Sequence, residues 1–395
     1  MLNEIEKIGE ENEEDVAMTP NAFPNQAVLW GTDWTTETVI NQLKKGNIEL
    51  NPSFQRRDAW TVDKKSNFIE SLFLGLPIPQ IILAERREKR GSYIVIDGKQ
   101  RLLSIRQFYS ENNDEYSTLK LKRLEVLKEL NNKSYVEIAQ TPELSSYLDA
   151  FENQAIRTIV IKNWKDEKYL YTVFLRLNTG SLELSPQELR QALHTGPFSD
   201  FADNYSLDSA QMMRIFKSDK PDFRMRDIEL YLRYLSFKYN IQGYTGNLKI
   251  FLDKTWIDLN KEWDAKKDDI IRESNELSNA IDAVYQIFGE SGAFRKWSVD
   301  SWQGLFNRAV YDVMVYYFSH VNIRDAALEK KENVVSAFKD LCVSDSDFMR
   351  AIEATTKSTN NTYYRYAAWG NLLAGILGIE IRVPEITART KSVTR

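Results

Sequence analysis

Residues 93–105 read Tyr-Ile-Val-Ile-Asp-Gly-Lys-Gln-Arg-Leu-Leu-Ser-Ile. The first four residues are of strand type, and the apolar residues from Leu102 to Phe108 recur at helical spacing. The stretch therefore predicts a strand, a sharp turn and a helix with one buried face. Gly98 permits both the turn and a close approach of the backbone to a ligand. The helix N-terminus presents unpaired N–H groups with the helix dipole behind them, an arrangement that favours an anion.

The polar residues of this stretch allow two interpretations. In the first, Lys99, Gln100 and Arg101 stand where a phosphate would lie, and Asp97 stands where a metal ion or a hydroxyl would be held. In the second, Asp97 caps the helix and Arg101 pairs with a surface carboxylate, because Asp and Gly are ordinary turn residues. These residues alone favour neither interpretation.

The overall composition is that of a soluble globular protein. The chain has 395 residues, of which 43% are hydrophobic and 28% are charged, which suggests two domains with an ample core. No apolar run reaches the length of a membrane span, and the acidic N-terminus lacks the features of a signal peptide. The single cysteine, Cys342, fits a reducing compartment. We therefore expect a cytoplasmic protein with no membrane partner.

Histidine and cysteine are too scarce for several kinds of site. His194 and His320 are the only histidines, so with Cys342 they cannot build a zinc site of the usual kind or a His-rich metal nuclease motif. Any metal is expected to be a hard ion, such as Mg²⁺, on carboxylates and phosphates. The formal net charge of −5 also argues against a surface coated in basic charge for non-specific DNA binding.

A local basic region stands out against this acidic background. Between residues 53 and 106, eleven basic side chains accompany six acidic ones, a local net charge of +5. Part of it is an extended segment, residues 51–60, in which Arg56 and Arg57 could reach phosphates and Gln55 could read a base edge. The alternative is a loop that its aromatic residues anchor to the core, with the arginines in solvent.

The pattern along the chain predicts four regions. Residues 1–22 are expected to be a disordered acidic leader, residues 23–204 a domain of mixed helices and strands, residues 205–385 an all-helical domain, and residues 386–395 a basic mobile tail. Within the mixed domain, the charged segment 85–91 is expected to be a solvated turn between two strands.

Three separate blocks then occur in one order. They are Pro52-x-Phe54-Gln55-Arg56 with Trp60, Ile96-Asp97-Gly98-Lys99-Gln100-Arg101-Leu102, and Phe174-x-Arg176-Leu177-Asn178-x-Gly180 with Leu184-Ser185-x-x-Glu188-Leu189-Arg190. Within the third block, Ser185-Pro186-Gln187-Glu188 also predicts a capping box at the start of a helix. Together the three blocks resemble the GmrS-type domain of unknown function, a branch of the ParB/sulfiredoxin-like superfamily. Its members occur in modification-dependent restriction and other anti-phage defence proteins. The blocks span about residues 45–200, and Arg224-x-x-Asp227-x-Glu229 extends the resemblance into the helical part.

The resemblance implies an α+β fold, with a ParB/sulfiredoxin-like nucleotide-binding domain over residues 23–204 followed by the helical domain. It also implies a pocket for nucleotide phosphates. The expected catalytic residues are Asp97, Gln100 and Arg101, and Asp97 is also expected to hold Mg²⁺. The expected nucleotide-binding residues are Gln55, Arg56, Gly98, Lys99, Arg176 and Asn178.

Two departures from the family pattern matter. The usual motif is Asp-Gly-Gln-Gln-Arg, and Lys99 replaces its first Gln with a point charge that suits a phosphate but cannot accept a hydrogen bond. Many relatives also carry a C-terminal nuclease domain with a His-Asn-His metal site, which two histidines cannot supply. Either the chain cuts nothing alone, or a partner subunit cuts, or the first domain itself nicks DNA.

We therefore predict a nucleotide-binding, NTP-hydrolysing component of a DNA-targeting restriction or anti-phage defence system, with Mg²⁺ as cofactor. One alternative is a non-catalytic DNA-binding sensor or adaptor that works with a separate nuclease. The other is a DNA-nicking nuclease that uses Asp97 and its neighbours. The identity of the nucleotide, the DNA signal that is sensed and the oligomeric state stay open.

Overall fold

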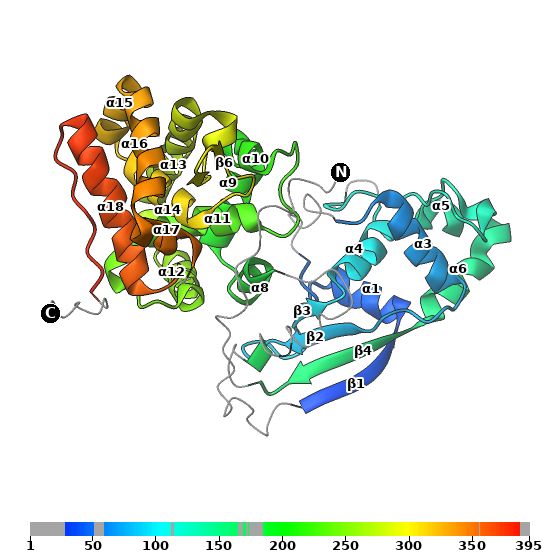
Figure 1. Ribbon diagram of the computed structural model, residues 1–395. Helices are drawn as coiled ribbons and strands as arrows, with labels where there is room; N and C mark the ends of the chain where they lie inside the picture. Colours follow the sequence, from blue (N-terminus) through cyan, green and yellow to red (C-terminus); the bar gives the residue numbers. More distant parts are fainter. Residues whose placement is uncertain are drawn as a thin grey trace. The chain divides into compact units, whose positions relative to one another are not determined.

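The computed structural model describes residues 28–50, 59–111, 114–164, 169–170, 173, 185–354 and 356–387. These residues form two compact units, which divide between Leu193 and His194. The first unit is a mixture of strands and helices and the second is almost entirely helical, which confirms the predicted α+β class (Figure 1). The predicted leader, residues 1–22, lies outside the described residues.

The first unit is built on a four-stranded sheet. Its strands stand in the order β1 (Val28–Thr35), β4 (Ala155–Lys162), β2 (Ile81–Glu85) and β3 (Tyr93–Asp97). Strands β1 and β4 are antiparallel, as are β2 and β3, whereas β2 and β4 run parallel. The carboxyl ends of β2 and β4 therefore point toward the same end of the sheet, and the carboxyl end of β3 points toward the opposite end.

Strands β2 and β3 are buried because their sequences are almost continuous runs of aliphatic residues. One face of these strands packs against α8 (Pro186–Leu193) through its buried residue Leu189. Strand β1 forms an edge of the sheet and is mostly exposed, including the indole of Trp30.

Helices α1 to α6 gather on one side of this sheet (Figure 1). Their bounds are α1 (Thr36–Lys44), α3 (Val62–Phe73), α4 (Lys99–Phe108), α5 (Tyr135–Ala139) and α6 (Ser145–Asn153), with the short 3-10 turns η3 (Lys128–Leu130) and η4 (Pro142–Leu144). The predicted amphipathic spacing of α4 is confirmed, because its apolar residues from Leu102 to Phe108 are fully buried. Phe108 packs against Phe73 and Phe151, so α4 joins α3 and α6 in one aromatic core.

The second unit is a bundle around α11 and α14. Its elements are α9 (Pro197–Asp208), α10 (Ala210–Phe216), α11 (Arg226–Asn240), η5 (Ile241–Gly243), α12 (Leu248–Lys261), α13 (Trp263–Gly292), β5 (Trp297–Ser298), β6 (Ser301–Trp302), α14 (Arg308–Phe318), α15 (Val321–Glu329), α16 (Lys331–Ser344), α17 (Ser346–Glu353) and α18 (Thr359–Leu377). The short β5–β6 hairpin is an addition to the purely helical unit that the sequence predicts. No described helix has the length and apolarity that crossing a membrane requires.

The ends of the second unit differ slightly from the expected domain limits. Helix α9 runs across the predicted boundary at 204/205 and packs against α11 and α12, so the structural division comes earlier. At the other end, Ile386 is buried and the N–H of Thr387 donates to the carbonyl of Gln242 at 3.2 Å. The start of the predicted tail is thus attached to the bundle.

A buried ionic network lies inside this bundle. Asp312 on α14 accepts hydrogen bonds from Arg233 on α11 at 3.0 and 2.6 Å and from Arg365 on α18 at 3.3 Å. The carboxylate of Asp312 is fully buried. Because two guanidinium groups share one carboxylate, the network ties three helices together at a defined register.

Candidate functional site

The Asp-Gly turn lies between β3 and α4, as the sequence predicts. Gly98 adopts the left-handed conformation, with φ +99° and ψ 13°. A Cβ atom at this position would lie 3.2 Å from Cγ1 of Ile81 and 3.3 Å from a terminal nitrogen of Arg101. Glycine is therefore required both by the backbone conformation and by the closeness of the Arg101 side chain.

Asp97 and Arg101 pair directly across this turn. Oδ2 of Asp97 accepts a hydrogen bond from Nη2 of Arg101 at 2.8 Å, and Oδ1 accepts one from the N–H of Gly98 at 2.8 Å. Nη2 of Arg101 also donates to the carbonyl of Gln80 at 3.0 Å. Arg101 is buried, whereas 18% of the Asp97 side chain is exposed. The arginine thus finds its carboxylate inside the motif and not on the surface.

Lys99 is bound by Glu188, which the sequence predicts only as a member of a capping box. Its ammonium donates to Oε1 of Glu188 at 2.7 Å, and only 7% of each side chain is exposed. Oε2 of Glu188 accepts from the N–H of Ser185 at 2.7 Å, and the Ser185 hydroxyl accepts from the N–H of Glu188 at 3.1 Å. The predicted capping box of α8 is therefore confirmed, and its glutamate also carries the ion pair.

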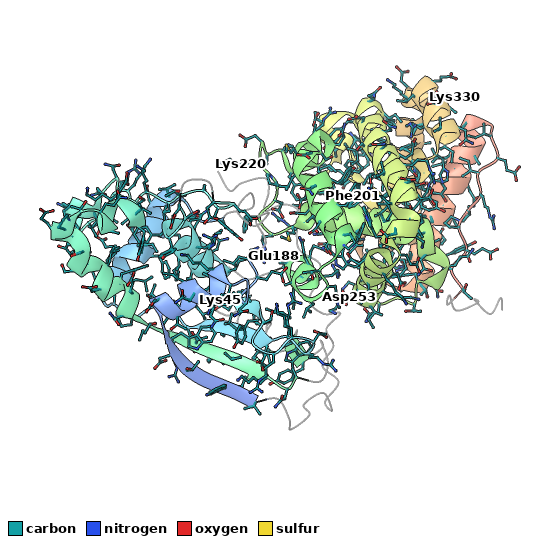
Figure 2. The ribbon with its side chains drawn as sticks, turned by 180° about the vertical axis from the view of Figure 1, so that it is seen from behind. Lys45, Glu188, Phe201, Lys220, Asp253 and Lys330 are labelled. Atoms are coloured by element: carbon teal, nitrogen blue, oxygen red, sulfur yellow. The ribbon has the colours of Figure 1, made fainter. Side chains whose placement is uncertain are left out.

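A signal for this partnership was present in the sequence. Lys99 occupies a motif position that is followed by a buried helix, and a buried ammonium requires a carboxylate. Glu188 lies in the third block of the same family pattern, on α8, where Figure 2 labels it. Sequence reasoning missed the pair because it assigned Glu188 only to its local capping role.

Some buried polar atoms of α4 and α8 have no hydrogen-bond partner among the described residues. They are Oε1 of Gln100 and Nε of Arg101 on α4, and both side-chain amide atoms of Gln191 on α8. Gln191 is 2% exposed, so its amide is removed from water with no partner in the part of the chain that the structure describes. A buried amide without a hydrogen bond costs free energy of folding. A bound group that hydrogen-bonds to these atoms of α4 and α8 would recover part of that cost.

The structure brings together part of the predicted site. Asp97, Gly98, Lys99, Gln100 and Arg101 are adjacent at the N-terminus of α4. Gln55, Arg56, Arg176 and Asn178 lie outside the described residues. Within the described residues, no group of three or more histidine, cysteine, aspartate or glutamate side chains converges as metal ligands would. A single carboxylate is still a sufficient protein donor for Mg²⁺ when phosphate oxygens and water complete the shell.

The block Arg224-x-x-Asp227-x-Glu229 and its neighbours form pairs inside the helical unit. The guanidinium of Arg226 binds Asp222 at 2.7 Å, and the carboxylate of Asp227 accepts from the hydroxyl of Ser206. Glu229 lies 3.2 Å from Nε of Arg308. These contacts are made within the helical unit and support its packing.

Comparison with known proteins gives one match. Residues 37–195 match the family model described as the GmrSD restriction endonuclease, N-terminal domain. No curated protein and no solved structure matches the chain. The matched region contains the Asp97–Arg101 motif and Glu188. The finding confirms the predicted resemblance over these residues, and the wider ParB/sulfiredoxin-like assignment stays a prediction.

Proposed function

Because residues 37–195 match the family model of the GmrSD restriction endonuclease N-terminal domain, we propose that this chain is a nucleotide-binding and nucleotide-hydrolysing component of a restriction or anti-phage defence system. Its substrate would be a nucleoside triphosphate with Mg²⁺, and its target would be DNA. The family match supports the restriction role. The residues of the motif support the nucleotide chemistry.

The Asp97–Arg101 pair at a helix N-terminus is the observation that carries this proposal. The ten-residue helix α4 directs its first N–H groups toward the turn, and Gly98 leaves the backbone accessible to a phosphate. In the structure Arg101 satisfies Asp97, and Nε of Arg101 has no partner among the described residues. A phosphate of higher charge would compete for this guanidinium and release the carboxylate of Asp97.

The released carboxylate fits Mg²⁺, because the ion prefers hard oxygen donors and is commonly held by one or two carboxylates with substrate phosphates. When bound, Mg²⁺ supplies charge neutralisation at the phosphates. Arg101 would bind the phosphate oxygens, and Asp97 would orient the attacking water. No covalent nucleophile is required, since phosphoryl transfer depends mostly on positioning and charge stabilisation.

Lys99 and Gln100 have different places in this proposal. The ammonium of Lys99 is already compensated by Glu188, so its contact with a phosphate would require an exchange of partners. Gln100 follows directly, and its Oε1 atom has no hydrogen-bond partner in the described structure. Gln100 would therefore accept from the attacking water or from a ribose hydroxyl. Gln55, Arg56, Arg176 and Asn178 remain proposed ligands of the nucleotide.

The test is phosphate release by the full chain with Mg²⁺ and each of ATP, GTP, CTP and UTP, with and without DNA. Arg101→Ala and Asp97→Asn are the informative variants. Arg106→Ala is a matched control, because Arg106 lies on the same helix and pairs with Asp114 at 2.7 Å away from the turn.

We expect release by the parent and by Arg106→Ala, and at least a hundredfold loss in the two motif variants, about the value of one transition-state charge contact. Absence of release with every nucleotide, beside salt-sensitive DNA binding, would instead indicate the non-catalytic adaptor. DNA nicking that Asp97→Asn abolishes, with DNA binding retained, would indicate the nuclease.

A further inference from the structure

A second basic site lies beyond the carboxyl ends of β2 and β4, at the end of the sheet opposite to the Asp97–Arg101 motif. A pocket of about 600 Å³ is lined by Glu85, Arg86, Arg87, Arg90, Lys162, Asn163 and Trp164. All of these residues belong to the first unit. We propose that this pocket binds the phosphate backbone of DNA, apart from the Asp97–Arg101 motif.

The sheet topology explains why these residues meet. Strands β2 and β4 are parallel neighbours, with Ala84 opposite Ile161, so the residues that follow them emerge side by side. Ligands of parallel sheets commonly bind beyond the carboxyl ends of the strands. The β2–β3 hairpin supplies the arginines, and the residues after β4 supply Lys162 and Trp164.

The pocket and the motif lie at opposite ends of β2. Asp97 is paired with Ile82, near the amino end of β2, whereas the pocket begins at Glu85, at its carboxyl end. At about 3.3 Å per residue, the two sites are separated by roughly 10 Å along the strand. A change in one site therefore need not disturb the other.

The charge of the pocket is strongly positive, with four cations and one carboxylate among its lining residues. The carboxylate of Glu85 accepts from the N–H of Gly91 at 3.0 Å and so holds the hairpin closed. Arg86 donates to Glu49 at 2.9 Å and to the carbonyl of Ala192 at 3.2 Å. Arg86 is therefore a structural residue, and the phosphate ligands that we propose are Arg87, Arg90 and Lys162.

Aromatic rings position two of these cations. The guanidinium of Arg87 lies 5.5 Å from the centroid of Trp164, and the ammonium of Lys162 lies 3.6 Å from the centroid of Trp30. The indole N–H of Trp164 donates to the carbonyl of Glu85 at 2.7 Å, which fixes the ring under the pocket. A cation that lies over an aromatic ring keeps its full positive charge, which attracts phosphate oxygens.

Phosphates fit this pocket better than a nucleobase. Trp164 is only 6% exposed, so its ring cannot receive a stacked base. Arg87 and Arg90 are exposed on the hairpin and can follow a charged backbone. The choice of DNA among polyanions rests on the proposed function, because residues 37–195 match the N-terminal domain of a restriction endonuclease.

The experiment compares two double variants of the full chain. Arg87→Gln/Arg90→Gln removes two charges from the pocket. Arg123→Gln/Lys128→Gln is the matched control, since it removes two exposed charges from the same unit away from the pocket. Binding of a fluorescein-labelled duplex and of a single strand is measured by anisotropy over a range of salt concentrations.

We expect the pocket variant to bind more weakly by about tenfold or more at low salt. The slope of log K against log salt should also fall by about 0.7 to 0.9 for each phosphate contact removed, while the control keeps the parent slope. An unchanged slope and affinity in the pocket variant, or an equal loss in the control, would overturn the proposal.

A second measurement separates this proposal from the nucleotide one. Phosphate release in the absence of DNA should be equal in Arg87→Gln/Arg90→Gln and in the parent. If neither chain releases phosphate but DNA binding still depends on the pocket, the proposed hydrolysis fails and the pocket stands. If both chains release phosphate and the pocket variant binds DNA as the parent does, the proposed hydrolysis stands and the DNA-binding role of the pocket fails.

Discussion

The ammonium of Lys99 lies 2.7 Å from Oε1 of Glu188, and this ion pair joins the first turn of α4 to the first turn of α8. The two residues are 89 positions apart in the chain. Both side chains are buried, and Glu188 also completes the capping box of α8, so the charge of Lys99 is matched by a carboxylate within the same unit.

Removal of the Lys99 charge should expose the dependence of α8 on this pair. In Lys99→Met, Glu188 is left as an uncompensated buried carboxylate, which typically costs about 3 to 5 kcal/mol. We expect faster hydrogen exchange at the amides of α8 and of the first turn of α4, measured by mass spectrometry of the full chain.

The double variant Lys99→Met/Glu188→Gln is the control for this experiment. The neutral amide oxygen can still accept from the N–H of Ser185, and no buried charge is left, so most of the protection should return. Equal exchange in Lys99→Met and the parent would show that the pair contributes little.

Gly98→Ala should destabilise the first unit more than Gly46→Ala does. Both glycines have positive φ, +99° and +65°, and an alanine in the left-handed region costs about 1 to 2 kcal/mol. Only at Gly98 would the added methyl group also meet Ile81 and Arg101, whereas nothing lies within 4 Å of a Cβ at Gly46. Urea unfolding of the two variants measures the difference, and equal losses would exclude the steric part of this argument.

Asp312→Asn should be strongly destabilising for the helical unit. It removes the buried carboxylate that binds both Arg233 and Arg365, while Glu229 stays 3.9 Å from Arg233, and we expect a loss of about 3 to 5 kcal/mol in the free energy of unfolding. Asp269→Asn is the matched control, because Asp269 pairs with Arg272 on the exposed surface of α13 and little change is expected. Thermal unfolding by calorimetry should separate the two variants, and similar midpoints would contradict the importance of the network.

The stability of the helical unit should decrease as the pH falls below the ordinary pKa of histidine. Burial, and then the ammonium of Lys238, lower the pKa of His320 from 6.5, against the opposing effect of Glu273 and Glu276. The unfolded chain therefore binds this proton more readily than the folded chain, so the stability is fully present above pH 6.5 and is lost as the pH falls through the lowered pKa.

His320→Gln should flatten that dependence. Urea unfolding of the parent and the variant at about pH 7.5 and about pH 5.5 brackets the histidine titration. His194→Gln controls for the loss of a histidine elsewhere in the unit. An equally steep decline in His320→Gln and the parent would assign the effect to other groups.

Local patterns in the sequence were sufficient for the elements around the motif. The strand from Tyr93, the turn at Gly98 and the capping box at Ser185 follow from strand propensity, backbone freedom and side-chain capping, which act over a few residues. For Lys99 the sequence indicates only that a buried ammonium needs a carboxylate. That this carboxylate is Glu188 depends on how α8 packs on the sheet.

The basic pocket also could not be predicted from local sequence patterns alone. The segment 85–91 is a charged turn by sequence, and the structure does place Arg87 and Arg90 in an exposed hairpin. It becomes part of a pocket only because β4 lies beside β2 in parallel, which brings Lys162 and Trp164 to the hairpin. The hydrophobic pattern of a segment identifies it as a strand, but it does not identify the strand that will lie beside it in the sheet.

The strand order also has a consequence for synthesis of the chain. On the ribosome β1 is made well before β4, its sole neighbour in the described sheet, where Thr35 pairs with Ala155. At about 5 to 20 residues per second, the nascent β1 waits several seconds with Trp30 and its apolar neighbours unpaired. The pairing of β1 with β4 can form only after β4 has emerged from the ribosome. Until then the unpaired strand β1 is a segment to which a ribosome-bound chaperone could bind.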